Sequence, residues 1–127
     1  MLAMIALGGA VGSVTRYLLG SVVQRTAGLA FPVGTLMVNV AGSFLAGFLL
    51  RYFMNVQTHP FLRGALIVGF CGGFTTFSAF TTETLGLFEG GEYARAALYV
   101  AASVALSLMA VFAGFAAGVV VVPHHSR

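Results

Sequence analysis

Residues 69–83 read GFCGGFTTFSAFTTE, and they lie inside a hydrophobic stretch that we expect to run from about Phe61 to Phe88. This stretch is longer than the roughly 20 residues that an α-helix needs to cross a bilayer. Gly72-Gly73, followed by two threonines, weakens a helix because these residues have low helix propensity. We therefore expect a membrane-spanning helix that is broken near its middle, at Gly72-Gly73.

A helix break at mid-membrane depth frees backbone carbonyls, and it is tolerated only where these groups are buried in protein or bind something. Freed carbonyls suit a hard cation such as sodium. Phe74, Phe77 and Phe80 follow at intervals of three and are expected to share one face. For Phe74 we expect ordinary packing. The electropositive ring edges of the other two are suited to weak contact with a small anion, or alternatively they pack against lipid or a helix.

Three further apolar stretches complete the chain, from about Leu2 to Val23, from Val33 to Phe53 and from Tyr93 to Val122. Pro123 and a short polar tail follow the last one. The 127 residues are 59% hydrophobic and only 7% charged, whereas soluble chains are about 25% charged. We expect an all-α, multi-pass protein of the cell (inner or plasma) membrane, with one four-helix transmembrane domain over residues 1–127.

Positive charge is almost balanced between the two sides of this predicted bundle. Arg51, Arg63 and Arg127 fall on the side of the N-terminus, Arg25 and Arg95 fall on the opposite side, and Arg16 is buried nearer the latter. Arginine and lysine bias sets membrane orientation, so this chain carries little orientation signal. Insertion in both orientations would allow an antiparallel homodimer. The alternative is that a difference of one charge is noise.

Arg16 is a cation that lies several residues from the nearest end of its predicted span, whereas the other arginines fall at or near span ends. It shares a helix face with Gly12 and Gly20, which lie four residues to either side. One interpretation is that its side chain reaches the headgroups, and the other is that it lines a vestibule that attracts anions. Gly8 and Gly12 form a pair of small residues suited to close helix packing.

Polar side chains recur at every fourth residue in two spans. They are Thr35, Asn39 and Ser43 in the second span and Tyr99, Ser103 and Ser107 in the fourth. Either stripe alone is compatible with helix-to-helix contact, but two stripes favour a polar path across the bilayer. Hydroxyls and an amide donate hydrogen bonds, and Glu83 is the only acidic residue of the third span. These residues indicate a narrow path for a small anion without choosing between fluoride, chloride and formate.

Three segments resemble the Fluc (CrcB) family of microbial fluoride channels. They are residues 8–17 (GGAVGSVTRY), 34–44 (GTLMVNVAGSF) and 69–80 (GFCGGFTTFSAF). With the matching length and four spans, the resemblance covers the whole chain. It implies passive, selective export of fluoride through two pores of an antiparallel, dual-topology homodimer.

The resemblance also implies roles for single residues. It places a structural sodium ion at the dimer centre, held by the backbone carbonyls of Gly72 and Thr75. It implies a vestibule at Arg16 and a fluoride pore lined by Asn39, Phe77, Phe80, Tyr99, Ser103 and Ser107. Thr35 and Glu83 fall at polar positions of the family and receive no role. Ala79 departs from the threonine or serine expected beside the pore phenylalanines.

Two other classes compete with a channel. Small multidrug-type antiporters exchange cations for protons and are four-span dimers of similar length, but they use a glutamate in the first span, where this chain has Arg16. A non-conducting structural subunit would not need aligned hydroxyls. No nucleophile with a paired base, metal cluster or phosphate loop is evident in the sequence, so we expect no enzyme. The arginines are scattered, so we expect no nucleic-acid partner.

Overall fold

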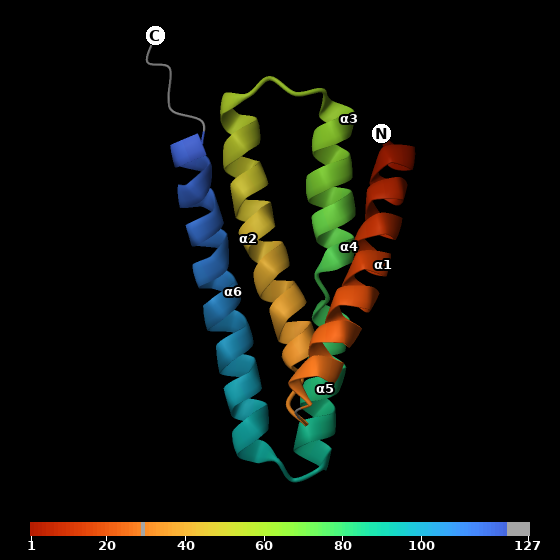
Figure 1. The fold of residues 1–127 in the computed structure, drawn as a ribbon, viewed down its shortest axis with the longest axis vertical. Coiled ribbons are helices and arrows are strands. Elements are labelled where there is room, and N and C mark those ends of the chain that lie inside the picture. Colours follow the sequence, from red (N-terminus) through yellow and green to blue (C-terminus); the bar gives the residue numbers. More distant parts are fainter. Residues whose placement is uncertain (29, 122–127) are drawn as a thin grey trace.

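The structure, a computed structural model, describes residues 1–28 and 30–121 (Figure 1). Leu29 and residues 122–127, which include Pro123 and the predicted polar tail, lie outside the described residues. The described elements are α1 (Leu2–Ala27), α2 (Val33–Asn55), α3 (Pro60–Arg63), η1 (Gly64–Cys71), α4 (Gly72–Phe74), α5 (Phe77–Glu89) and α6 (Tyr93–Val121). Elements α3 to α5 form one span, and all four spans are long and apolar enough to cross a membrane. This confirms the prediction of an all-α, four-span chain.

The termini and the connecting loops of the spans lie at the two opposite ends of the helix bundle. The N-terminus and the end of α6 lie at one end, and the α1–α2 loop and the α5–α6 turn lie at the other (Figure 1). Helix α1 runs four residues further than the predicted Val23 and ends at Ala27; it is capped by Gly28, whose φ of 60° is left-handed. Gly91, with φ 75°, makes the turn between α5 and α6.

The third span is interrupted, but not at the predicted residues. Helical backbone continues through Gly72 and Gly73 to Phe74, and the extended residues are Thr75 (φ −84°, ψ 156°) and Thr76 (φ −147°, ψ 112°). The preceding η1 segment is a π-helix, which the sequence did not predict. The prediction of a break at Gly72-Gly73 was therefore wrong by two to three residues. Gly73 instead permits close packing, because a Cβ there would collide with the carbonyl of Gly9.

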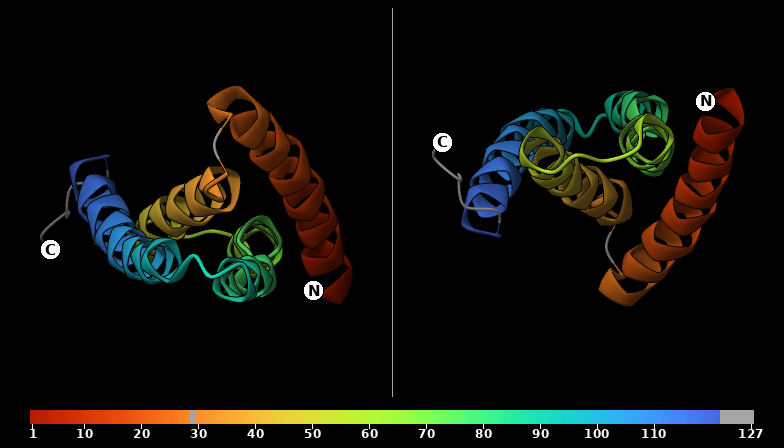
Figure 2. Two further views of the ribbon diagram at one scale, coloured as in Figure 1. Left: turned by 90° about the horizontal axis from the view of Figure 1, so that it is seen from below. Right: turned by 90° about the horizontal axis from the view of Figure 1, so that it is seen from above.

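Glycines bring the helices together in two close pairs. In one pair, a Cβ on Gly8 or Gly12 of α1 would collide with backbone carbonyls of η1, which confirms the predicted packing role of both glycines. In the other, Gly47 of α2 and Gly114 of α6 each face a carbonyl of the opposite helix in the same way. Figure 2 shows α1 along one side and α6 along the other, with α2 and the third span between them. The third span, which carries the break, therefore packs closely on α1.

Candidate functional site

The amide of Asn39 holds the break in the third span. Its Oδ1 accepts a hydrogen bond from the backbone N–H of Thr76 at 2.7 Å, and its Nδ2 donates to the carbonyl of the same residue at 3.0 Å. The predicted stripe on α2 therefore faces the third span. An amide placed in this way satisfies two backbone groups that the interrupted helix cannot pair. Asn39 is thus bonded to the backbone, and one N–H of its Nδ2 is left for another contact.

Two further side chains bind the break. Arg16 donates from Nε to the carbonyl of Gly73 at 3.1 Å, and Ser13 donates to the same oxygen at 3.4 Å. Thr76 caps the next helix, because its Oγ1 accepts from the backbone N–H of Ala79 at 3.1 Å. Arg16 is therefore not simply an arginine reaching for the headgroups, since its guanidinium bonds to the helix break.

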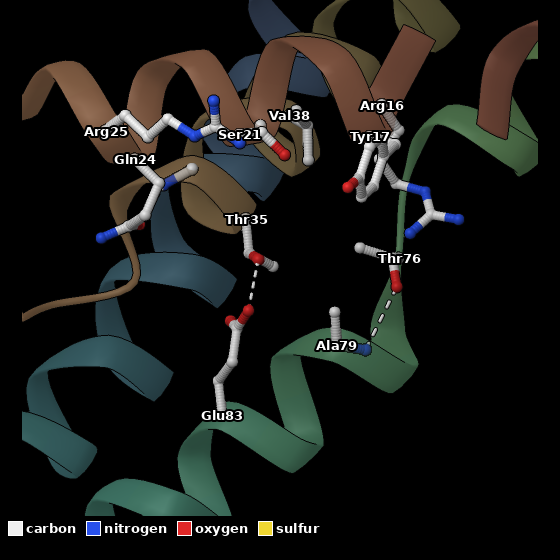
Figure 3. Close-up of a pocket in the computed structure, with 12 residues that line it drawn as sticks. Arg16, Tyr17, Ser21, Gln24, Arg25, Thr35, Val38, Thr76, Ala79 and Glu83 are labelled. Atoms are coloured by element: carbon white, nitrogen blue, oxygen red, sulfur yellow. Dashed lines mark hydrogen bonds between the residues drawn. The ribbon is translucent and has the colours of Figure 1, made fainter. Parts of the chain in front are cut away.

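A cavity of about 380 Å³, here called the vestibule cavity, opens beside the break (Figure 3). Its polar lining residues are Arg16, Tyr17, Ser21, Gln24, Arg25, Thr35, Thr76 and Glu83. Two arginines and one carboxyl group therefore line the same cavity. The expected vestibule residue, Arg16, lies in this cavity, and Arg25 is a second cation that the sequence did not single out.

Glu83 is held at the wall of the vestibule cavity by two hydroxyl groups. Thr35 donates to its Oε1 at 2.7 Å (Figure 3), and Tyr99 donates to its Oε2 at 2.6 Å. Tyr99 is fully buried, with its ring 5.2 Å from that of Phe80 and 5.4 Å from that of Phe31. Thr35 and Glu83, which had no role in the sequence analysis, therefore form one hydrogen-bonded cluster with Tyr99.

A second cavity, of about 360 Å³ and here called the groove, brings together most of the predicted pore residues. Its lining includes Asn39, Ser43, Thr75, Thr76, Phe77, Phe80, Ser103 and Ser107. Thr76 also lines the vestibule cavity, so the two cavities share one residue. Tyr99 is not among the residues that line the groove, because it lies one turn along α6 and is bonded to Glu83.

The groove has apolar and hydrogen-bonding walls. The rings of Phe77 and Phe80 lie 5.5 Å apart, Phe77 is largely exposed, and Phe80 is buried. Phe74 is separated from them by the break, so the three rings do not share a face, and it stacks on Phe70 in ordinary packing as expected. The Oγ of Ser103 is buried and has no hydrogen-bond partner among the described residues.

Gly72 and Thr75, the residues expected to hold sodium, line a third cavity of about 370 Å³. Gly72 is exposed, and a Cβ built on it would meet nothing within 4 Å. Carbonyl oxygens are suitable ligands for a hard cation. In the described part of the chain, no group of three or more His, Cys, Asp or Glu side chains could hold a metal.

Thr76 is a second site residue, besides Arg25, that the sequence analysis missed. It lines two cavities, caps α5 and bonds to Asn39. A signal was present, because a threonine followed by a new helical segment is a typical N-cap. The contact with Asn39 joins two spans and is not visible in a local pattern.

Comparison with known proteins identifies the family. A sequence profile described as "CrcB-like protein, Camphor Resistance (CrcB)" matches residues 3–115. The chain belongs to the CrcB-like family. It is 50% identical over 114 residues to a protein of Rhizobium meliloti, a match that covers 89% of this chain and 91% of the relative. A Thermus thermophilus protein is 47% identical over 115 residues, covering 91% of this chain and 92% of the relative. Both are named fluoride-specific ion channel FluC.

Membership of the CrcB-like family confirms the resemblance seen in residues 8–17, 34–44 and 69–80. Its curated relatives carry the names of ion channels rather than enzymes. The expectation of a multi-pass membrane transport protein is therefore confirmed by both the family and the four spans.

Proposed function

We propose that this single four-helix domain is a passive, fluoride-selective channel. The observation that carries the proposal is the buried hydroxyl of Ser103, which has no partner among the described residues and belongs to a groove walled by Phe77 and Phe80. A buried polar group without a partner in a native protein calls for an explanation, and an anion accepting its hydrogen bond provides one. The relatives' name, fluoride-specific ion channel, supports fluoride as that anion.

The geometry suggests how the ion moves. Arg16 and Arg25 raise the local anion concentration in the vestibule cavity. The ion passes Thr76 into the groove, where the hydroxyls of Ser103 and Ser107 and the ring edges of Phe77 and Phe80 replace part of its hydration shell. Ring edges bind an anion weakly, so the ion can leave again, as conduction requires.

The channel is, in this proposal, an antiparallel homodimer with two pores, one along each groove. The exposure of Gly72 supports a second copy, because backbone groups of a break cannot face lipid without a partner. A structural sodium ion between the copies is held by the carbonyls of Gly72 and Thr75, two from each chain. Bound sodium neutralises these carbonyl dipoles and links the two copies.

Dual topology has its own test. In a Cys71→Ala background, we expect Gln57→Cys, in the exposed α2–α3 loop, to react with a membrane-impermeant thiol reagent from both sides of the membrane in comparable fractions. Labelling from one side alone would contradict the antiparallel dimer.

The proposal of passive conduction is tested in liposomes that contain purified protein and fluoride. We expect rapid fluoride release when valinomycin lets potassium leave with it, little release without valinomycin, and no acceleration by an imposed pH gradient. Release that requires the pH gradient would favour the alternative, a small multidrug-type exchanger. Absence of release from folded protein would overturn the channel.

A further inference from the structure

At the break, side chains replace backbone carbonyls as the acceptors of two N–H groups. In a continuous α-helix the carbonyl of each residue accepts from the N–H four residues later, so Gly72 would accept from Thr76 and Thr75 from Ala79. The Thr76 N–H instead donates to Asn39 Oδ1 at 2.7 Å, and the Ala79 N–H donates to Thr76 Oγ1 at 3.1 Å. The two carbonyls expected to hold sodium are therefore the ones whose helical donors have been taken by side chains.

The neighbouring carbonyls, those of Gly73 and Thr76, accept hydrogen bonds from side chains. The oxygen of Gly73 accepts from Arg16 and Ser13, and the oxygen of Thr76 accepts from Asn39 Nδ2. Side-chain donors thus bind the carbonyls beside Gly72 and Thr75. Side-chain acceptors bind the two N–H groups that would otherwise donate to the carbonyls of Gly72 and Thr75. Asn39 takes part in both actions, because its amide both accepts and donates.

We propose that Asn39 is a positioning residue for the cation site, in addition to its place in the groove. By accepting the Thr76 N–H, it keeps the Gly72 carbonyl free for a cation. The inference rests on the proposed function, since it takes the sodium site from there. Helix α2 packs directly on the break at this point, because a Cβ on Gly42 would collide with the Thr75 side chain. Asn39 is therefore held in place from its own helix.

Replacing Asn39 separates this role from contact with fluoride. In Asn39→Leu no side-chain acceptor remains, and the Thr76 N–H gains by returning to the Gly72 carbonyl, because an unpaired amide inside a membrane is unfavourable. In Asn39→Asp an oxygen still accepts the Thr76 N–H, whether or not the carboxyl group is protonated. The aspartate would nevertheless place an acid beside the anion path.

The test is the sodium dependence of thermal stability, measured on the purified full-length chain in detergent. The melting temperature is followed as sodium chloride replaces N-methyl-D-glucamine chloride at constant ionic strength. An ion that binds only the folded state raises the melting temperature. We expect Asn39→Leu to raise the midpoint of the sodium titration by about tenfold, the equivalent of one lost hydrogen bond. Asn39→Asp is not expected to raise the midpoint, because the acceptor for the Thr76 N–H remains and a carboxylate attracts a cation, but it is expected to lose fluoride flux.

Ser103→Ala is the matched control, because it alters the groove while the Ser103 hydroxyl makes no hydrogen bond to the break. This variant should also keep the wild-type midpoint. An unchanged midpoint in Asn39→Leu, or equal losses in Asn39→Leu and Asn39→Asp, would overturn the positioning role while leaving the sodium site intact. No sodium response in the wild-type chain would overturn the sodium site and this inference together, while fluoride release would still decide the channel. Asn39→Ala replaces Asn39→Leu if the latter does not fold, with the same expectation.

Discussion

Tyr99→Phe is the most informative single change to the hydrogen-bonded cluster of Thr35, Glu83 and Tyr99. It removes one hydroxyl and leaves the ring contacts with Phe80 and Phe31 in place. The lost hydrogen bond joins the Tyr99 hydroxyl to Glu83 Oε2 at 2.6 Å, and Tyr99 is 0% exposed. Glu83 itself is half-buried at the wall of the vestibule cavity, so water can replace part of the lost bond, and the carboxylate keeps the hydroxyl of Thr35.

The loss of one hydrogen bond to a half-buried acceptor destabilises the folded state by about 0.5–1.5 kcal/mol, which is a factor of about 2 to 13 in the unfolding equilibrium. The matched control is Tyr52→Phe, because the Tyr52 hydroxyl has no hydrogen bond within the described part of the chain; it should change stability by less than about 0.5 kcal/mol. Stability is followed by circular dichroism as sodium dodecyl sulfate is added to detergent-solubilised protein. Equal stability of the two variants would refute a stabilising hydrogen bond between Tyr99 and Glu83.

Three further predictions concern packing and the groove. Gly47→Ala should destabilise the chain by about 1–3 kcal/mol in the same titration, because its Cβ meets the Val111 carbonyl. Gly86→Ala, whose Cβ meets nothing within 4 Å, should be neutral or slightly stabilising. A larger loss of stability in Gly86→Ala than in Gly47→Ala would contradict the packing. Ser103→Ala should lower fluoride efflux from liposomes about tenfold, because an anion in the groove loses one donor; unaltered efflux would remove this hydroxyl from the path. Phe77→Ile should lower efflux while leaving the elution volume on size exclusion unchanged, and normal flux would place the ring outside the pore.

The four spans could be predicted from the sequence because length and hydropathy alone define a membrane helix. The faces of α2 and α6 could be predicted as well, since residues four apart share one side of a helix, and Asn39, Ser103 and Ser107 do meet in one groove. The family resemblance supplied the specific roles, and the ion pathway, the sodium site and the dimer remain predictions.

The position of the break could not be derived from propensity. Gly72 and Gly73 have the lower intrinsic preference for a helix, yet the interruption falls at Thr75 and Thr76, where Asn39 supplies replacement hydrogen bonds from another span. The bonds of Glu83 to Thr35 and Tyr99 were missed for the same reason, because three different spans contribute to them. Tertiary contacts decide these features, and one sequence carries no record of them.

The most direct test of the central claim is ion selectivity, read with a fluoride electrode and a chloride electrode on one preparation of liposomes that contain the purified chain, with valinomycin carrying the compensating potassium. A groove with few hydroxyl donors and two phenylalanine ring edges is expected to release fluoride rapidly and no measurable chloride. Release of both anions at comparable rates would contradict selective fluoride conduction through this groove.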